Sequence, residues 1–350
     1  MKNRIEKLRN TLKDNEAVYI SGYPNIFYYS GFTSPDARLI ISHNEQIILT
    51  DSRYTIQARE QAPDFELMDI SKSYKSAFER TQNLHLGFEG DNLTINELKK
   101  IKSVITQKQS IEDMHQKINA PRKIKDREEI KKIAQAEEIG DEAFLYVLNK
   151  IHTGMSEKEL ALELEFFMKR AGASALSFET VAASGARSAM PHGTASDKLI
   201  QNGDFLTLDF GCIFEGYCSD MTRTVVLGKA QEWQKEIYDV VLKAQQEALK
   251  AITVGKKCSD IDKIARDIIT DAGYGENFGH GLGHSVGIEI HEMPSLSPKC
   301  DEVITDGHVL TVEPGIYIEG RGGVRIEDLI VVENLKPQNL TSSTKELIEI

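Results

Sequence analysis

Two aspartates stand inside an otherwise apolar hairpin, in the stretch FLTLDFGCIFEGYCSDMTRTVVLG that begins at residue 205. If the turn of this hairpin lies at Phe214 and Glu215, Asp209 faces Asp220 across the two strands. Carboxylates this close together and this poor in water repel one another unless a proton or a metal ion lies between them. A single aspartate could also mark a turn or a strand end, so the pair alone leaves both explanations open.

The same pattern recurs near the C-terminus, in the stretch HVLTVEPGIYIEGRGGVRIEDLIVVE. Glu313 and Glu327 lie in two apolar segments that are symmetric about Gly320, so we expect them to approach one another across a second hairpin. Arg325 stands two residues before Glu327 on the same strand face, where it can pair with a carboxylate or with a substrate. Glu313 could also simply end a strand, because proline and glycine follow it.

Three histidines lie between the two hairpins, among the glycines of NFGHGLGHSVGIEIHEMPS. These are His280, His284 and His291, and the glycines allow close approach of an imidazole to its neighbours. His284 and His291 are seven residues apart, which neither a helix nor a strand turns into a chelating pair, so we expect them to have different roles. One such histidine is more often a hydrogen-bonded polar residue, but an imidazole with four carboxylates suits divalent metal ions.

Charge decides how many ions such a site would hold. Two divalent ions neutralise four carboxylates, whereas a single zinc ion would leave a buried negative cluster. Bridging carboxylates suit manganese, cobalt or zinc, and two ions about 3.5 to 4 Å apart can activate water and polarise a carbonyl. We therefore expect two divalent metal ions, with manganese as the first choice and cobalt or zinc as alternatives.

The elements that must position these residues fall into two predicted domains. Before residue 120, the apolar patterns predict strands at 17–20, 38–50 (as a hairpin) and 84–88 and a helix at 94–105, which is typical of a small α/β domain. A proline and a run of charges then mark a boundary near Lys123. The prediction is an N-terminal α/β domain at 1–122 and a catalytic domain at 123–350.

The second domain mixes long helices with the strands that carry the acidic residues. A long amphipathic helix follows the boundary, and the next helix begins at Ser156 with Glu159 three residues later, the spacing of a capping box, and ends at Gly172. A further pair of helices is expected at 232–252 and 259–274. Strands dominate the remainder, so this domain is expected to be α+β.

The composition excludes several classes of partner. Among 350 residues, 42 are basic and 54 are acidic, which gives a net charge of −12. Such a chain repels phosphate backbones and anionic lipids, so we expect neither a nucleic acid nor a membrane as a partner. No stretch has the ~18 to 20 apolar residues of a membrane span, and the charged N-terminus lacks the apolar centre of a signal peptide, so we expect a cytoplasmic protein.

The four cysteines show neither a zinc-ribbon nor a disulfide pattern, because they are irregularly spaced and contain no CxxC pair. We expect reduced, partly buried thiols. The four positions are Cys212, Cys218, Cys258 and Cys300.

Five motifs in order make residues 208–328 resemble the creatinase-fold, or pita-bread, metallopeptidases, and specifically their Xaa-Pro aminopeptidase and prolidase branch. The motifs are LDFG, YCSDMTRT, GHSVGIEIHE, TVEPGIY and GGVRIED. The resemblance implies an α/β N-terminal domain followed by an α+β pita-bread catalytic domain, small proline-containing peptides as substrates, and a homodimer. It also implies five ligands for two metal ions: Asp209, Asp220, His284, Glu313 and Glu327.

The resemblance implies roles for the remaining site residues as well. His192 in PHG and His291 in IHE match two family histidines that contact the substrate and support the tetrahedral intermediate and proton transfer. Arg325 matches the family arginine beside the last glutamate. For the shuttle that carries the proton to the leaving nitrogen, our choice is Glu313.

The length of the substrate depends on one position. Several prolidases carry an arginine four residues after the catalytic histidine, suited to hold the carboxylate of a dipeptide, and this chain has Ser295 there. The loss of that cation favours an Xaa-Pro aminopeptidase that accepts tripeptides and longer chains. The alternative is an Xaa-Pro dipeptidase in which Arg187, Arg321 or a partner subunit supplies the charge.

Methionine aminopeptidases share the ligands but generally lack such an N-terminal domain. A non-catalytic scaffold of the same fold is the remote alternative.

Overall fold

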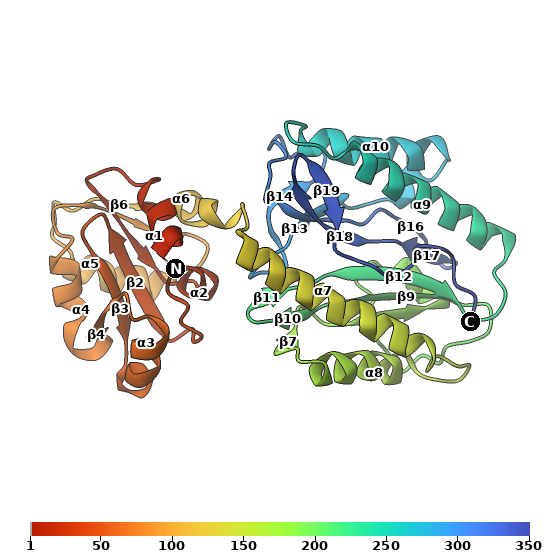
Figure 1. Cartoon of the computed structure of the whole chain (residues 1–350), viewed down its shortest axis with the longest axis horizontal. Helices are drawn as coiled ribbons and strands as arrows, with labels where there is room; N and C mark the ends of the chain where they lie inside the picture. Colours follow the sequence, from red (N-terminus) through yellow and green to blue (C-terminus); the bar gives the residue numbers. More distant parts are fainter. Residues whose placement is uncertain (1) are drawn as a thin grey trace. The chain divides into compact units, whose positions relative to one another are not determined.

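The structure, a computed structural model, describes residues 2–350. The chain divides into two compact units, Met1–Arg122 and Lys123–Ile350 (Figure 1). Each unit has its own hydrophobic core. Within the described residues, no helix is both long and apolar enough to span a membrane.

The N-terminal unit is built on a six-stranded mixed sheet with the strand order β4-β3-β2-β1-β5-β6. The predicted strands and the predicted helix of this part are all present. Helices α4 and α5 contribute Phe78 and Ile101 to a core that includes Tyr19 and Ile40 from the sheet. The strands are β1 Glu16–Ile20, β2 Ala37–Ser42, β3 Gln46–Thr50, β4 Glu66–Asp69, β5 His85–Phe88 and β6 Ile111–Asp113. The helices are α1 Lys2–Arg9, α2 Tyr23–Ser30, α3 Thr55–Gln61, α4 Ile70–Glu79, α5 Ile95–Val104 and α6 His115–Asn119, with 3₁₀ turns at Ser52–Tyr54 and Ala120–Arg122.

The second unit places its strands between two pairs of helices (Figure 1). On one side, α7 and α8 pack on β8, β9 and β12, with Phe144, Leu164 and Leu208 in the shared core. On the other side, α9 and α10 pack on the C-terminal strands, with Val241 and Leu310 in a second core. The helices are α7 Arg127–Leu148, α8 Glu157–Arg170, α9 Glu232–Ala251 and α10 Cys258–Asp271, with 3₁₀ turns at Gly185–Ala189 and Gly275–Asn277.

Its strands form four small sheets, with the orders β12-β9-β8, β14-β13-β15-β18-β19, β11-β10-β7 and β16-β17. The first strands are β7 Ala175–Leu176, β8 Val181–Ser184, β9 Phe205–Phe210, β10 Cys212–Phe214, β11 Tyr217–Cys218 and β12 Met221–Val226. The later ones are β13 Gly283–Ser285, β14 Glu292–Leu296, β15 Val309–Val312, β16 Gly315–Ile318, β17 Gly322–Arg325, β18 Asp328–Glu333 and β19 Lys336–Asn339. The predicted capping box is present, because the Ser156 side chain accepts from the Glu159 backbone N–H at the start of α8.

The hairpin that carries Asp209 and Asp220 turns one residue later than predicted. Its turn residues are Glu215 and Gly216, with φ of 46° and 85°, the left-handed geometry that a tight two-residue hairpin turn requires. The pairing of β9 with β12 therefore sets Asp209 opposite Thr222, so the predicted pairing with Asp220 was wrong. Asp220 precedes β12, and a shift of two residues in the partner strand leaves its side chain on the same face as before.

The second acidic hairpin has the predicted register. Gly315 in β16 lies opposite Arg325 in β17, which centres the ladder on Gly320. The same register continues from β15 into β18. Glu313 lies in the short gap between β15 and β16, and Glu327 lies in the short gap between β17 and β18. The common register therefore places the two glutamates beside one another.

All four cysteines are buried and unpaired, in line with the prediction of reduced thiols. Burial raises the pKa of Cys212, Cys218 and Cys258 to about 12, so these thiols stay protonated near neutral pH. They act as small packing residues in the second unit.

Candidate metal centre

One cavity of about 490 Å³ in the second unit is lined by all five predicted ligands. Asp209 lies within β9 and His284 within β13, where a bulge follows it. Asp220, Glu313 and Glu327 lie in gaps between strands. Five separate chain segments therefore contribute ligands to this cavity, two of them strands and three of them gaps between strands.

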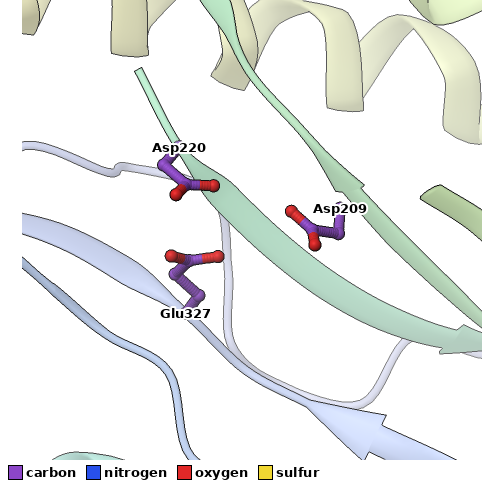
Figure 2. A group of neighbouring side chains, drawn as sticks. All are labelled: Asp209, Asp220 and Glu327. Carbon is purple, nitrogen blue, oxygen red and sulfur yellow. The ribbon is translucent and has the colours of Figure 1, made fainter. Parts of the chain in front are cut away.

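Three of the carboxylates form a compact cluster. One oxygen from each of Asp209, Asp220 and Glu327 lies within 4.8 Å of the other two. Figure 2 shows the three side chains converging from β9, from the start of β12 and from the segment between β17 and β18. The two aspartates are thus brought together as expected, although they do not pair directly across the strands.

His284 connects this cluster to the fourth carboxylate. Its Nε2 atom lies 3.5 Å from Asp220 Oδ2 and 3.4 Å from Glu313 Oε1. The His291 ring packs edge-on against the His284 ring, with 4.4 Å between their centroids. One imidazole nitrogen and four carboxylates therefore surround a single volume.

The protonation of these groups reflects the lack of water around them. Burial raises the pKa of Asp220 and Glu327 well above their usual values, and the neighbouring carboxylates raise it further. Burial likewise raises the pKa of Glu313 to about 8 and lowers the pKa of His284 to about 4. The low pKa keeps the imidazole neutral and able to ligate, and a cation in the cavity would favour the ionised form of the carboxyls.

Two oxygen atoms of the cluster show directly that the residues fit a cation. Asp209 Oδ1 and Glu327 Oε1 are buried and accept no hydrogen bond from any residue between 2 and 350. The second oxygen of each is used, because Asp209 Oδ2 accepts from Arg325 at 2.5 Å and Glu327 Oε2 accepts from Thr222 at 2.7 Å. A buried carboxylate oxygen without a donor costs roughly 1 to 3 kcal/mol, which a divalent ion would offset.

The Arg325 guanidinium is buried and hydrogen-bonded to protein groups around the carboxylate cluster. It is 3% exposed, and it donates to Asp209 Oδ2 from Nη2, to the Tyr317 hydroxyl from Nη1 at 2.8 Å and to Thr222 Oγ1 from Nε at 3.0 Å. Nη1 also donates to the Pro191 carbonyl. Of the two partners expected for Arg325, a carboxylate or a substrate, the structure shows the carboxylate.

The predicted catalytic histidines His192 and His291 also line the cavity. Burial lowers the pKa of His291, and the charge of the nearby His192 imidazole lowers it further. His280 lines the cavity too, with Nε2 3.0 Å from the Tyr317 hydroxyl and Nδ1 2.8 Å from the Gly281 carbonyl. His280 is thus held by protein groups on both sides of its ring.

Sequence analysis missed Tyr317. Its hydroxyl joins Arg325 to His280, and burial raises its pKa to about 12. Strand alternation could have found it, because residues 313, 315 and 317 share one face, the face that carries Glu313. The hairpin places Gly323 opposite Tyr317. The glycine leaves room for the Tyr317 ring, because a Cβ atom on residue 323 would lie 2.9 Å from that ring.

Comparison with known proteins extends over the whole chain. Residues 4–124 match the creatinase/prolidase N-terminal domain, and residues 131–334 match metallopeptidase family M24. The Xaa-Pro dipeptidase of Pyrococcus horikoshii is 39% identical, over 99% of each chain. Two solved structures are similar throughout. The Xaa-Pro dipeptidase from Bacillus anthracis has a TM-score of 0.96 at 40% identity and covers 100% of this chain and 99% of its own. The X-Pro aminopeptidase from Thermotoga maritima has a TM-score of 0.91 at 37% identity and covers 99% of this chain and 100% of its own.

These matches agree with the fold class predicted from the motifs, an α/β domain followed by a pita-bread catalytic domain. They also agree with the hydrolytic chemistry that a carboxylate-lined cavity with four histidines supports. The chain belongs to metallopeptidase family M24 and is a peptide-bond hydrolase with a creatinase/prolidase N-terminal domain.

Proposed function

We propose that this chain is an Xaa-Pro peptidase that removes an N-terminal residue from a following proline with the help of two divalent metal ions. The observation that carries the proposal is the convergence of four carboxylates, two buried and two partly buried, with one neutral imidazole. Two of the carboxylate oxygens have no donor among residues 2–350. The proline preference is supported by two relatives that bear the name Xaa-Pro dipeptidase and are 39% and 38% identical over nearly the whole chain. The proposed metal ligands are Asp209, Asp220, His284, Glu313 and Glu327.

Two divalent ions bound there would polarise the scissile carbonyl and lower the pKa of water. Manganese is the first choice, because four of the five ligands are carboxylates. Hydrolysis adds the oxygen of water to the carbonyl carbon, breaks the C–N bond and delivers a proton to the leaving proline nitrogen. We assign that proton transfer to Glu313, the carboxylate that lines the cavity 3.4 Å from His284 Nε2.

The other residues of the cavity orient the substrate. His192 and His291 are assigned to the substrate and to the oxygen that becomes negative as the tetrahedral intermediate forms. Arg325 fixes the position of Asp209 through a 2.5 Å bond, and Thr222 fixes Glu327 through a 2.7 Å bond. Phe178 and Ile290 add apolar surface to the cavity, which suits a proline ring.

On substrate length we propose an Xaa-Pro aminopeptidase that accepts tripeptides. Ser295 lines the cavity and shares a 3.0 Å hydroxyl contact with Ser297, so it offers no charge to a dipeptide carboxylate. Arg325 is the one lysine or arginine among the cavity-lining residues of the described chain, and it is already bonded. Arg187 pairs with Glu157 at 3.0 Å, and Arg321 lies over the Trp233 ring at 4.3 Å. The second candidate, an Xaa-Pro dipeptidase, is favoured by the names of two similar relatives.

Steady-state kinetics on Ala-Pro and Ala-Pro-Ala test this choice. We expect kcat/KM to be higher for the tripeptide, and we expect Ser295→Arg to raise kcat/KM for the dipeptide by on the order of tenfold or more, since a charge-assisted bond contributes about 1.5 to 3 kcal/mol. Ser295→Met is the matched control, because it adds similar length without charge. Cleavage of the dipeptide and not of the tripeptide by the unmodified protein would make it a prolidase.

We also propose that the protein is a homodimer and that it is located in the cytoplasm. Sedimentation analysis of the purified protein measures the subunit number, and a mass of one chain would exclude the dimer.

A further inference from the structure

A segment near the C-terminus, Thr341–Thr344, makes polar contacts with several elements of the catalytic unit. Its backbone and side chains bond to α7 through Asp141, which accepts from the backbone N–H groups of Ser342 and Ser343, each at 2.7 Å. Asp141 is 4% exposed, so these bonds are shielded from water. This segment, which we call the C-terminal clamp, is therefore fixed in position on the helix.

Thr341, the first residue of the clamp, is connected to Asp220 through the buried side chain of Glu137. Thr341 Oγ1 donates to Glu137 Oε1 at 2.5 Å, and Glu137 Oε2 accepts from the Asp220 backbone N–H at 3.3 Å. The Thr341 hydroxyl also accepts from the Leu329 backbone N–H at 2.8 Å, which ties it to the start of β18. Glu137 is fully buried and does not line the cavity.

The second contact leads to Glu327 by way of a buried arginine. Arg223, at 1% exposure, donates to the carbonyls of Ser343 and Thr344 at 2.7 and 2.9 Å. The same guanidinium donates to the Glu327 carbonyl and, at 2.8 Å, to Asp328 Oδ1. Arg223 likewise does not line the cavity.

Asp220 and Glu327 are the two cluster carboxylates that lie outside a strand, so ladder hydrogen bonds alone do not fix their backbones. The Glu327 backbone N–H donates to the Thr222 carbonyl at 3.1 Å. The backbone of each carboxylate is also bonded to an ionisable residue with negligible exposure, Glu137 or Arg223, and both of these residues are bonded to the clamp. A hydrogen bond to a ligand's own backbone orients its carboxylate in the way that outer-shell groups orient metal ligands.

We propose that the C-terminal clamp positions two metal ligands, with Glu137 acting on Asp220 and Arg223 acting on Glu327. The proposal rests on the proposed function, because it takes these two carboxylates as ligands. Glu137, Arg223 and Thr341 are positioning residues, since none of them reaches the cavity.

Thr341 offers a matched pair of substitutions. Thr341→Val keeps the shape of the side chain and removes the hydroxyl, whereas Thr341→Ser keeps the hydroxyl. We expect Thr341→Val to weaken Co²⁺ binding by on the order of tenfold and to change the visible absorption spectrum of the bound ion. Thr341→Ser should bind Co²⁺ within about twofold of the unmodified protein and show its spectrum, since the bond to Glu137 is retained.

Two further variants separate positioning from general loss of stability. Glu137→Met, which removes both acceptors, should weaken Co²⁺ binding at least as much as Thr341→Val does. Ile269→Val is the control, because it trims a buried core side chain of α10 that does not line the cavity and so should cost stability alone. Its Co²⁺ spectrum and affinity should be unchanged. In the Mn²⁺-loaded enzyme, Thr341→Val should lower kcat and leave KM for Ala-Pro-Ala within about twofold, since the clamp does not contact the substrate.

The possible failures are distinguishable. If unmodified protein binds Co²⁺ and Thr341→Val and Glu137→Met bind it equally well with the same spectrum, the clamp is wrong and the proposed function stands. If Ile269→Val weakens binding as much as Thr341→Val, the effect is general destabilisation and the clamp is again wrong. If unmodified protein gives no Co²⁺ spectrum, both proposals fall.

Discussion

Glu327 and His291 line the same cavity, and their surroundings give them different chemistry. Glu327 is 1% exposed and keeps one oxygen without a donor within the carboxylate cluster, which is a position for a ligand. His291 is part of no such cluster in residues 2–350, and it lies beside His192 and over the His284 ring. Loss of each side chain should therefore have a different signature.

Glu327→Ala should lower both the metal content and the turnover, because it removes a proposed ligand. His291→Ala should lower turnover by roughly a hundredfold or more, the usual contribution of a group that assists proton transfer, and leave two ions bound. Elemental analysis of both purified variants beside kcat on Ala-Pro-Ala makes the comparison. Equal metal loss in the two variants would show that His291 is misassigned.

His308 is a buried histidine outside the cavity that links stability to pH. It is 3% exposed, and its Nδ1 accepts from the Thr305 backbone N–H at 3.2 Å. Burial lowers its pKa to about 4, and the charges of Lys125 and Lys123 lower it further, while Glu302 raises it. Its ring is therefore neutral in the folded protein.

Because the unfolded chain protonates His308 near its ordinary pKa of 6.5, acid favours the unfolded state. The unfolding free energy should be unaffected above that value and should fall as the pH drops from 6.5 towards 4. His308→Asn retains an acceptor for Thr305 and does not titrate, so it should lose about 2 kcal/mol less stability than the unmodified protein between pH 7 and pH 5. Urea denaturation at both pH values measures this, and parallel losses would contradict it.

At the scale of elements, the segment before α7 supports the loop that carries His291. Lys125 Nζ lies 2.8 Å from Ser285 Oγ and 3.1 Å from Glu292 Oε2, with the two charged side chains 1% and 6% exposed. Glu292 Oε1 in turn accepts from the Ile288 backbone N–H at 3.0 Å, within the loop between β13 and β14. One buried ion pair therefore holds the loop that connects His284, a proposed metal ligand, to His291, a proposed catalytic residue.

Lys125→Met should lower the unfolding free energy by about 3 to 5 kcal/mol, because it removes one partner of a buried ion pair. It should also lower kcat/KM, since the loop of His291 loses its support. Lys123→Met is the control, because its pair with Glu302 is about one-third exposed and should contribute no more than about 1 kcal/mol. Urea denaturation of both variants decides the matter, and equal losses would contradict the structural role of the buried pair.

At the scale of the whole molecule, the two units have different tasks. Every proposed metal ligand lies between residues 209 and 327 and thus in the second unit. The chain has a single tryptophan, Trp233 in α9, so its fluorescence reports on that unit alone. Metal binding can therefore be observed through the stability of the unit that binds.

Chelation should abolish peptidase activity, and Mn²⁺ should restore it, because four carboxylates that line one cavity repel one another without a cation. With Mn²⁺ at about a hundred times its dissociation constant, the unit should gain about 2.7 kcal/mol, which raises the midpoint seen by Trp233 fluorescence by roughly 5 to 10 °C. Thermal melts with and without chelator measure the shift. Full activity in protein shown by elemental analysis to be metal-free would falsify the two-metal proposal.

The sequence by itself identified features that follow from local rules. Alternation along a strand put Glu313 and Glu327 in register about Gly320, and a three-residue spacing predicted the cap of α8. The order and type of the five proposed ligands indicated the family before any contact was known. These features depend on neighbours in the chain, which the sequence shows directly.

Only the tertiary structure decided how those groups are used. The turn at Glu215 and Gly216 moved the register of the first hairpin by an amount that residue spacing does not reveal. Arg325 reaches Asp209 across 116 residues of sequence, and Thr341 reaches Glu137 across 204. Such bonds form only after the intervening segments have packed, so their partners cannot be read from either segment alone.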